Sequence, residues 1–286
     1  MSTRPVLAAI DFSPTSVAAL EFAIAVAKKR GAPVHVVHAY AIPIVPLAEG
    51  GALLTDDFDH QVRAALERDL GQLVAAHRTH VEMEWHLVHG PPVEALLREA
   101  RRLGAGLVVL GTHGRSGFTR FVLGSVAERL ARACPVSVLV VPPREAGPRS
   151  VRSILCGVDF SVGADVALRA ALELAAEQGA TLHVAHVWDA GLHGASDVRA
   201  RAESDLRREL ESLVGRHPMP GLVVQRHLAT GVPYVALVEL GRSLAADMIV
   251  VGTHGKSALE HFLMGSVAER VLRGSPVPVL VARQER

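Results

Sequence analysis

The sequence predicts an α/β protein with two tandem domains, each built on a parallel sheet with helices on both faces. Three observations support this prediction. At 286 residues the chain is longer than most single domains. Short apolar runs alternate with longer helical patterns, which implies right-handed crossovers between parallel strands. Segments of the first half also recur in the second half, as expected for two copies of one fold.

The elements of the first copy follow from their hydrophobic patterns. Short apolar runs predict strands that are buried on both faces, and longer segments with helical spacing predict the helices between them. The predicted strands are Val6 to Ile10, Val34 to Ala39, Glu84 to Val88, Leu107 to Leu110 and Val136 to Val141. The predicted helices are Thr15 to Arg30, Asp57 to Ala76, Val93 to Leu103 and Ser125 to Ala133.

The repeat fixes the domain organisation. Asp11-Phe12-Ser13 recurs as Asp159-Phe160-Ser161, an offset of 148, whereas Gly111 matches Gly252 at an offset of 141. The second copy is therefore seven residues shorter, and we expect the difference in the Pro- and Gly-containing stretch 41–51. Prolines and charges in 142–149 disfavour helix and strand interiors, so the predicted domains are residues 1–146 and 147–286.

Composition excludes several classes of function. The 30 Lys and Arg nearly balance the 29 Asp and Glu, so no global field attracts nucleic acid or anionic lipid. No apolar stretch is long enough to span a bilayer, and the N-terminus lacks the apolar region of a secreted precursor. Cys134 and Cys156 lack the spacing of a disulfide framework or a zinc site. We expect a cytoplasmic protein with both cysteines buried.

A glycine-rich loop follows the fourth strand of each copy. In both copies Gly-x-x-Gly is followed after nine residues by Gly-Ser at the start of a helix. Glycine lets backbone N–H groups approach a phosphate with no Cβ in the way, and a helix N-terminus favours an anion. Arg115 and Lys256 add positive charge within the loops. The two loops therefore predict two phosphate sites.

Each feature of these loops also has a structural alternative. The Ser-x-x-Glu patterns that begin at Ser125 and Ser266 are typical of capping boxes. Asp11 and Asp159 can serve as helix N-caps or close Asx turns. The duplicated glycine spacing after a strand favours the phosphate site. The spacing does not fit a Walker A loop or a dinucleotide fingerprint.

Histidines are plentiful, but their spacing argues against a metal site. His35 and His38 lie three apart on a strand, so they point to opposite faces and cannot chelate together. We expect structural or solvent-linked roles for them and no metal. For hydrolysis, residues 114–118 fail the G-x-S-x-G pattern and no H-E-x-x-H occurs, so no catalytic group is predicted.

The chain resembles the universal stress protein family over essentially its whole length. The Asp-Phe-Ser after the first strand, the G-2x-G-9x-G-S motif and a closing Pro-Val-x-Val-Leu-Val strand each occur twice. The resemblance implies that each domain is a five-stranded parallel sheet of the Rossmann-like, adenine nucleotide alpha hydrolase-like type. It makes the closing strand the edge of each sheet. The glycine motif marks the ATP-binding branch of the family.

The resemblance also implies the residues that surround ATP. Asp11 and Asp159 would lie at the nucleoside end, and the backbones around Ala39 and Val187 would meet the adenine. The implied first phosphate site consists of Gly111, Gly114, Arg115, Ser116, Gly124 and Ser125. The implied second phosphate site consists of Gly252, Gly255, Lys256, Ser257, Gly265 and Ser266.

These features favour a stress-response or signalling protein in which ATP alters conformation or partner choice with little turnover. Phosphate-cradling groups are evident, whereas a base to activate water is not. A weak ATP-hydrolysing enzyme and a scaffold that no longer binds nucleotide are the alternatives, and a role for Mg²⁺ stays open. Gly117 becomes Ala258 and Pro14 becomes Val162 in the second copy, which is expected to bind less well.

The two closing strands predict an intramolecular pseudo-dimer. An open apolar edge strand invites pairing, and covalent linkage raises the effective concentration of one copy for the other. We expect the two fifth strands to lie side by side across an approximate two-fold axis, with the nucleotide sites outside the contact. Pro278 lacks an N–H, so pairing there must use flanking residues or leave that position unpaired. Further self-association of the whole chain is left open.

Overall fold

The computed structural model describes residues 4–41, 56–77, 81–112, 123–143, 150–189, 196–253 and 264–284. The elements of the first copy are β1 (Val6–Ala9), α1 (Pro14–Arg30), β2 (Val34–Tyr40), α2 (Asp56–Ala76), β3 (Met83–His89), α3 (Pro92–Arg102), β4 (Leu107–Gly111), α4 (Ser125–Ala133) and β5 (Ser137–Val141). The elements of the second copy are β6 (Ser153–Val158), α5 (Val162–Gln178), β7 (Thr181–Trp188), α6 (Ser196–Gly215), β8 (Val224–Thr230), α7 (Pro233–Ser243), β9 (Met248–Gly252), α8 (Ser266–Gly274) and β10 (Val279–Ala282). Every predicted boundary of the first copy lies within one residue of the observed one.

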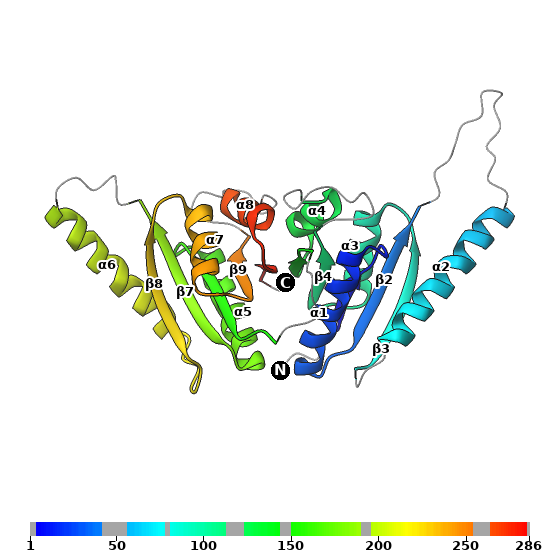
Figure 1. Cartoon of the computed structure of the whole chain (residues 1–286), viewed down its shortest axis with the longest axis horizontal. Helices are drawn as coiled ribbons and strands as arrows, with labels where there is room; N and C mark the ends of the chain where they lie inside the picture. Colours follow the sequence, from blue (N-terminus) through cyan, green and yellow to red (C-terminus); the bar gives the residue numbers. More distant parts are fainter. Residues whose placement is uncertain are drawn as a thin grey trace, which may run out of the picture.

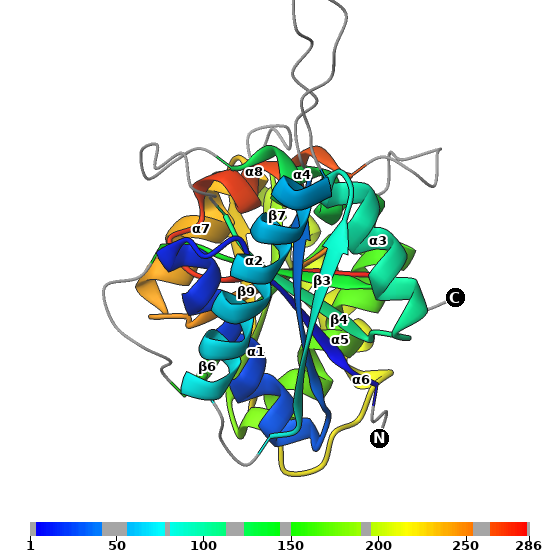
Figure 2. The same ribbon diagram turned by 90° about the vertical axis from the view of Figure 1, so that its right-hand side faces the viewer.

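The strands of both copies form one continuous sheet in the order β3-β2-β1-β4-β5-β10-β9-β6-β7-β8. Pairing is parallel within each copy. Figure 1 shows the two halves meeting at the centre, with α2 and α6 at the outer ends. Figure 2, seen from the α2 end, shows helices on both faces of the twisted sheet. The α/β fold class is confirmed.

Strand alternation divides the core into two layers. Val6 and Ala8 face the layer of α1 and α2, whereas Leu7 faces the layer of α3 and α4. Successive strand residues point to opposite faces, so an unbroken apolar run fills both layers. Residues of the second copy join the same two clusters, with α5 and α6 in the first layer and α7 and α8 in the second.

The closing strands β5 and β10 pair antiparallel, with Val138 opposite Val281 and Leu139 opposite Leu280. This is the contact that the apolar closing strands predicted. Pro278 precedes the paired segment, and its carbonyl accepts a 2.9 Å hydrogen bond from the Ile249 N–H within the second copy. The missing N–H therefore removes no bond from the β5–β10 ladder.

A network of four charges joins α4 and α8 across this contact. Arg273 pairs with Glu128 at 2.7 Å, and Arg132 pairs with Glu269 at 3.5 Å. The sequence offset of 141 relates the two pairs, as expected for an approximate two-fold axis. These side chains are partly exposed, so each pair adds about 0–1 kcal/mol and mainly fixes the orientation.

The predicted domain boundary near residue 147 lies outside the described residues and stays a prediction. Among the residues that the structure describes, no helix has the length and apolar character needed to cross a membrane.

Candidate nucleotide site

The first strand of each copy ends in the same unusual turn. Phe12 and Phe160 have φ angles of 64° and 60°, in the left-handed region that side chains rarely adopt. In the first copy the Ser13 N–H and hydroxyl both donate to Asp11 Oδ1, at 3.0 and 2.6 Å. The Ser161 N–H and hydroxyl donate to Asp159 Oδ1 at 3.1 and 2.5 Å. Each aspartate therefore closes an Asx turn at the carboxyl end of its strand.

The serines of these turns start the following helices. Ser13 Oγ accepts the Ser16 N–H at 3.2 Å, and Ser161 Oγ accepts the Ala164 N–H at 3.1 Å, so both are N-caps. Of the two structural roles considered for Asp11, the structure shows the Asx turn, whereas Ser13 is the N-cap of the helix. The turn holds the aspartate at the sheet edge where ligands of such folds gather.

A buried histidine is hydrogen-bonded to the residue that precedes the aspartate of each turn. His38 Nδ1 lies 2.6 Å from the Ile10 carbonyl oxygen, and His186 Nδ1 lies 2.8 Å from the equivalent Val158 oxygen. Because a carbonyl only accepts, each Nδ1 carries the proton. The His38 ring also packs against the Phe12 ring, with centroids 4.8 Å apart. These histidines have the structural role that the sequence predicted.

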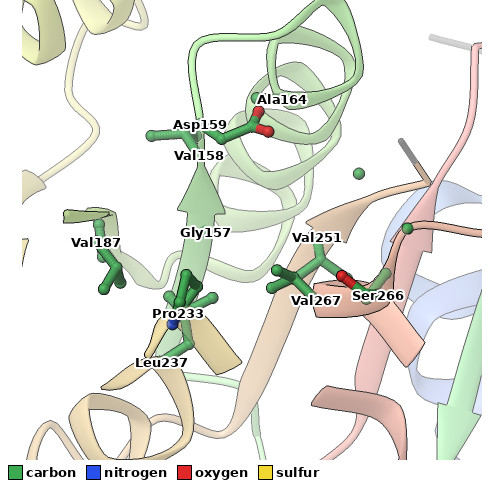
Figure 3. A pocket seen from close by; sticks show the side chains of 14 residues that line it. Gly157, Val158, Asp159, Ala164, Val187, Pro233, Leu237, Val251, Ser266 and Val267 are labelled. Atoms are coloured by element: carbon green, nitrogen blue, oxygen red, sulfur yellow. The ribbon is translucent and has the colours of Figure 1, made fainter. Parts of the chain in front are cut away.

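A cavity of about 280 Å³ opens at this edge of the second copy. Figure 3 shows Asp159 and Val158 at the end of β6, Val187 to one side, and Val251, Ser266 and Val267 on the other. The described residues that line the cavity are Gly157, Val158, Asp159, Ala164, Ala185, Val187, Pro233, Leu237, Val251, Gly252, Gly265, Ser266, Val267 and Ala268. The walls are mainly apolar, with a carboxylate at one end and a helix N-terminus at another.

The structure brings together every second-copy site residue that it describes. Asp159, Val187, Gly252, Gly265 and Ser266 all line the cavity, although they come from four separate segments of the chain. The other predicted members lie outside the described residues; they are Gly114, Arg115, Ser116, Gly255, Lys256 and Ser257.

The capping-box interpretation of the loop serines is wrong. Gly124 and Gly265 are the N-caps of α4 and α8, and Ser125 and Ser266 occupy the first helical position. The chain enters each helix through an extended glycine, which moves the serine one residue too far to cap. No described side chain caps either helix. The first turn of α8 lines the cavity, and the N–H groups at a helix N-terminus are donors suited to an anion.

Two of the predicted glycines also have a packing role. A Cβ added to Gly252 would lie 2.5 Å from the Gly163 carbonyl oxygen at the start of α5. One added to Gly111 would lie 2.8 Å from Thr15 Cγ2 and 3.0 Å from the Thr15 carbonyl carbon. These glycines let the ends of β9 and β4 approach the first turn of the neighbouring helix, which places the Asx turn close to the end of that strand.

The ends of each loop are held together in the same way. Gly124 N–H donates to the Thr112 carbonyl at 2.7 Å, and Gly265 N–H donates to the Thr253 carbonyl at 2.7 Å. The residue after β4 is therefore hydrogen-bonded to the N-cap of α4, and the residue after β9 to the N-cap of α8.

In the first copy Asp11 follows β1, Ala39 and Gly111 lie near the ends of β2 and β4, and Gly124 and Ser125 begin α4, as their counterparts do in the second copy. Six of the residues that line the second-copy cavity differ from their first-copy counterparts. Five of the first-copy residues carry more side-chain atoms, namely Ala9, Ile10, Ser16, Val37 and Leu110 in place of Gly157, Val158, Ala164, Ala185 and Val251, whereas Ala39 is smaller than Val187. The second copy therefore has the roomier walls.

Sequence reasoning missed the wall residues Pro233 and Leu237 of α7 and Val267 of α8. They are ordinary apolar residues on amphipathic helices. Their proximity to the site depends on helix packing, which periodicity does not specify.

Comparison with known proteins places this geometry in a family. The sequence model of the Universal stress protein family matches residues 2–142 and 150–283. Universal stress protein Rv2005c of Mycobacterium tuberculosis is 31% identical over 297 residues, which cover 98% of this chain and 97% of the relative. Universal stress protein Rv1996 of the same species is 29% identical, over 97% of this chain and 94% of the relative.

Solved structures support the same fold. A universal stress protein from Archaeoglobus fulgidus superposes with a TM-score of 0.74 at 24% identity, covering 99% of both chains. The functionally unknown protein PA1789 from Pseudomonas aeruginosa gives a TM-score of 0.69 at 18% identity, over 99% of this chain and 93% of that one. With both halves matched by one family, this chain belongs to the universal stress protein family as a tandem member.

Proposed function

We propose that this protein binds ATP at the strand ends of both copies, and that occupancy alters its conformation or its choice of partner in stress response or signalling. One observation carries the proposal. Five residues selected from the sequence for nucleotide binding, on four separate segments, line a single cavity in the second copy.

The walls of the cavity suit the parts of a nucleotide. Val187, Leu237 and Val267 offer an apolar surface for a purine ring. Asp159 lies at one end, and a carboxylate accepts several hydrogen bonds, so the Asx turn still allows it to accept from a ribose hydroxyl. Gly265 and Ser266 start α8, where N–H groups and the helix dipole favour phosphate oxygens. The cavity of about 280 Å³ is near the lower end of small-molecule sites.

Binding without rapid turnover fits the described residues better than catalysis. Of the described residues that line the cavity, Asp159 alone can titrate, and its Oδ1 already accepts two hydrogen bonds from Ser161. Hydrolysis needs a base within reach of the phosphate to accept a proton from the attacking water. Slow hydrolysis assisted by Mg²⁺ is the second candidate.

We also propose that the second copy is the stronger site, contrary to the sequence expectation. That expectation depended on Val162, at the start of α5, and on Ala258, which lies outside the described residues. The described walls favour the second copy, since five of the six wall residues that differ are smaller there, Gly157 and Ala185 among them, and only Val187 is larger than its counterpart.

Thermal unfolding with and without ATP tests the proposal. A ligand that binds only the native state at about one hundred times Kd adds about 2.7 kcal/mol to the free energy of unfolding. We expect the Tm to rise in millimolar ATP, and measurement of released phosphate separates binding from hydrolysis. An unchanged Tm in ATP would favour the scaffold alternative.

A further inference from the structure

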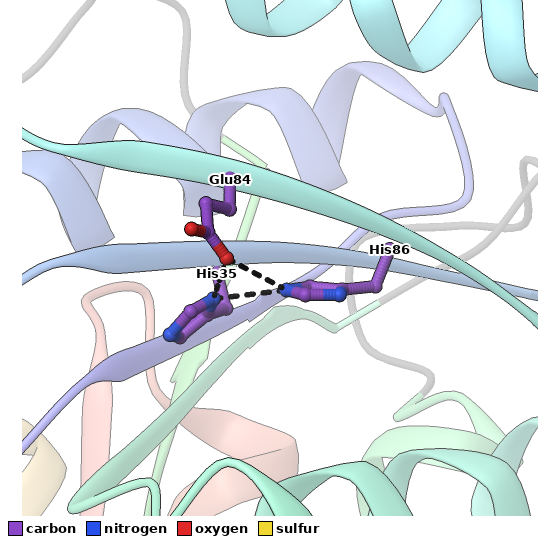
Figure 4. A group of neighbouring side chains, drawn as sticks. All are labelled: His35, Glu84 and His86. Carbon is purple, nitrogen blue, oxygen red and sulfur yellow. Dashed lines mark hydrogen bonds and ion pairs between the residues drawn. The ribbon is translucent and has the colours of Figure 1, made fainter.

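Three side chains of β2 and β3 converge outside the nucleotide cavity. His35 Nδ1 lies 2.9 Å from His86 Nε2 and 3.6 Å from Glu84 Oε2, and His86 Nε2 lies 3.8 Å from the same oxygen. The register places His35 opposite Glu84, and alternation puts Glu84 and His86 on one face of β3. Figure 4 shows the three side chains pointing toward one another from neighbouring strands.

The separations of these three atoms fit a single metal ion. Three points separated by 2.9, 3.6 and 3.8 Å lie on a circle of radius about 2.0 Å. Zn²⁺ binds histidine nitrogen at about 2.0–2.1 Å and carboxylate oxygen at about 2.0–2.2 Å. One ion near the centre of the circle contacts all three atoms without movement of either strand.

We propose that His35, Glu84 and His86 form a binding site for a divalent transition-metal ion, and that Zn²⁺ is the ion this ligand set favours. Two imidazoles and a carboxylate are a ligand set of protein zinc sites that keep a fourth position for water. The Glu84 side chain is 60% exposed, which gives water access to that position. The His35 and His86 side chains are only 12% and 20% exposed, so packing holds the two rings in place.

Charged neighbours of the cluster are compatible with a cation. Arg102 Nη2 lies 3.4 Å from His86 Nδ1, and Arg102 also donates to Glu99 Oε2 at 2.6 Å. Metal binding at Nε2 puts the proton on Nδ1, so the guanidinium must turn outward. Its side chain is 54% exposed and stays anchored by Glu99. Burial lowers the pKa of His35 and of His86, which keeps both rings in the neutral form that binds metal.

The second copy supplies a natural comparison. His183 Nδ1 and His227 Nε2 form the same pair at 3.0 Å, but Gln225 stands at the position of Glu84. A neutral amide is a weaker ligand for Zn²⁺ than a carboxylate. The proposal therefore assigns one metal site to each chain, in the first copy.

Titration of the metal-free full chain with Zn²⁺ tests the site, by calorimetry for affinity and native mass spectrometry for stoichiometry. ATP is left out because its phosphates bind Zn²⁺ themselves. We expect Glu84→Gln, which gives the first copy the ligands of the second, to weaken binding by more than about tenfold, because loss of a supporting group alone costs about 10–100-fold. Gln225→Glu, which completes the second set, should add a second equivalent.

Co²⁺ provides an independent readout, since its visible absorption reports coordination by imidazole and carboxylate. The wild-type spectrum should change on Glu84→Gln, while an unchanged Tm of the metal-free variant shows that the fold is retained. The proposal is overturned if the wild-type chain binds no Zn²⁺, or if Glu84→Gln binds Zn²⁺ with the same affinity and stoichiometry.

Discussion

Substitution of Gly252 by alanine should destabilise the fold through one identifiable contact. The new Cβ would lie 2.5 Å from the Gly163 carbonyl oxygen and 2.7 Å from its carbonyl carbon. Both are backbone atoms, so relief requires β9 to move away from the start of α5. Overpacking of this kind costs about 1–3 kcal/mol, which corresponds to a fall in Tm of roughly 2–12 °C for a protein of this size.

Gly111→Ala is the matched variant in the first copy. Its closest contact, at 2.8 Å, is with Thr15 Cγ2, a side-chain methyl group, and the nearest backbone atom is 3.0 Å away. A smaller movement relieves this clash, so we expect a smaller loss than for Gly252→Ala. Differential scanning calorimetry without nucleotide measures both variants. Equal Tm values for Gly252→Ala and wild type would refute the packing role of this glycine.

Two further predictions follow from the cavity and from the cysteines. A Cβ at Gly157 would lie 2.8 Å from Leu237 Cδ1, so Gly157→Ala should push the Leu237 side chain into the cavity. We expect weaker ATP binding with little change in Tm. Wild-type ATP affinity of this variant in calorimetry would contradict the prediction. Burial raises the pKa of Cys156 to about 12 and also raises the pKa of Cys134, so neither native thiol should react with iodoacetamide at pH 8, whereas both should react in denaturant. Mass spectrometry counts the alkylated thiols, and rapid labelling of the native chain would contradict the assigned burial.

The fold could be predicted from the sequence because the hydrophobic pattern of each element agrees with its place in the overall α/β architecture. Buried parallel strands such as Leu107–Gly111 are continuous apolar runs, and turn residues separate them from the helices. The repeat added independent support, since each landmark appears twice. The antiparallel contact of β5 and β10 followed from their apolar edges, but the charge network between α4 and α8 did not, because it depends on how the paired strands orient the helices.

The candidate sites could be predicted from the sequence only in part. Asp159 and Gly265 belong to short motifs that can be recognised in the sequence, whereas Leu237 reaches the cavity only through helix packing. His35 and His38 cannot chelate together, because they lie on opposite faces of β2. The side chains that join His35 in the proposed metal site come from the neighbouring strand β3. That meeting depends on strand register, which no pattern within β2 specifies.

The central claim is that the glycine loops and the helix starts that follow them bind ATP, and calorimetric titration of a double variant tests it most directly. Gly124 and Gly265 have φ angles of −64° and −61°, which alanine adopts without strain, so Gly124→Ala with Gly265→Ala should stay folded. Gly274→Ala, at the other end of α8 and in open space, is the control. We predict that wild type and the control bind ATP and that the double variant has lost most of its affinity. Wild-type affinity in the folded double variant, or no binding by the wild-type chain at millimolar ATP, would contradict the account.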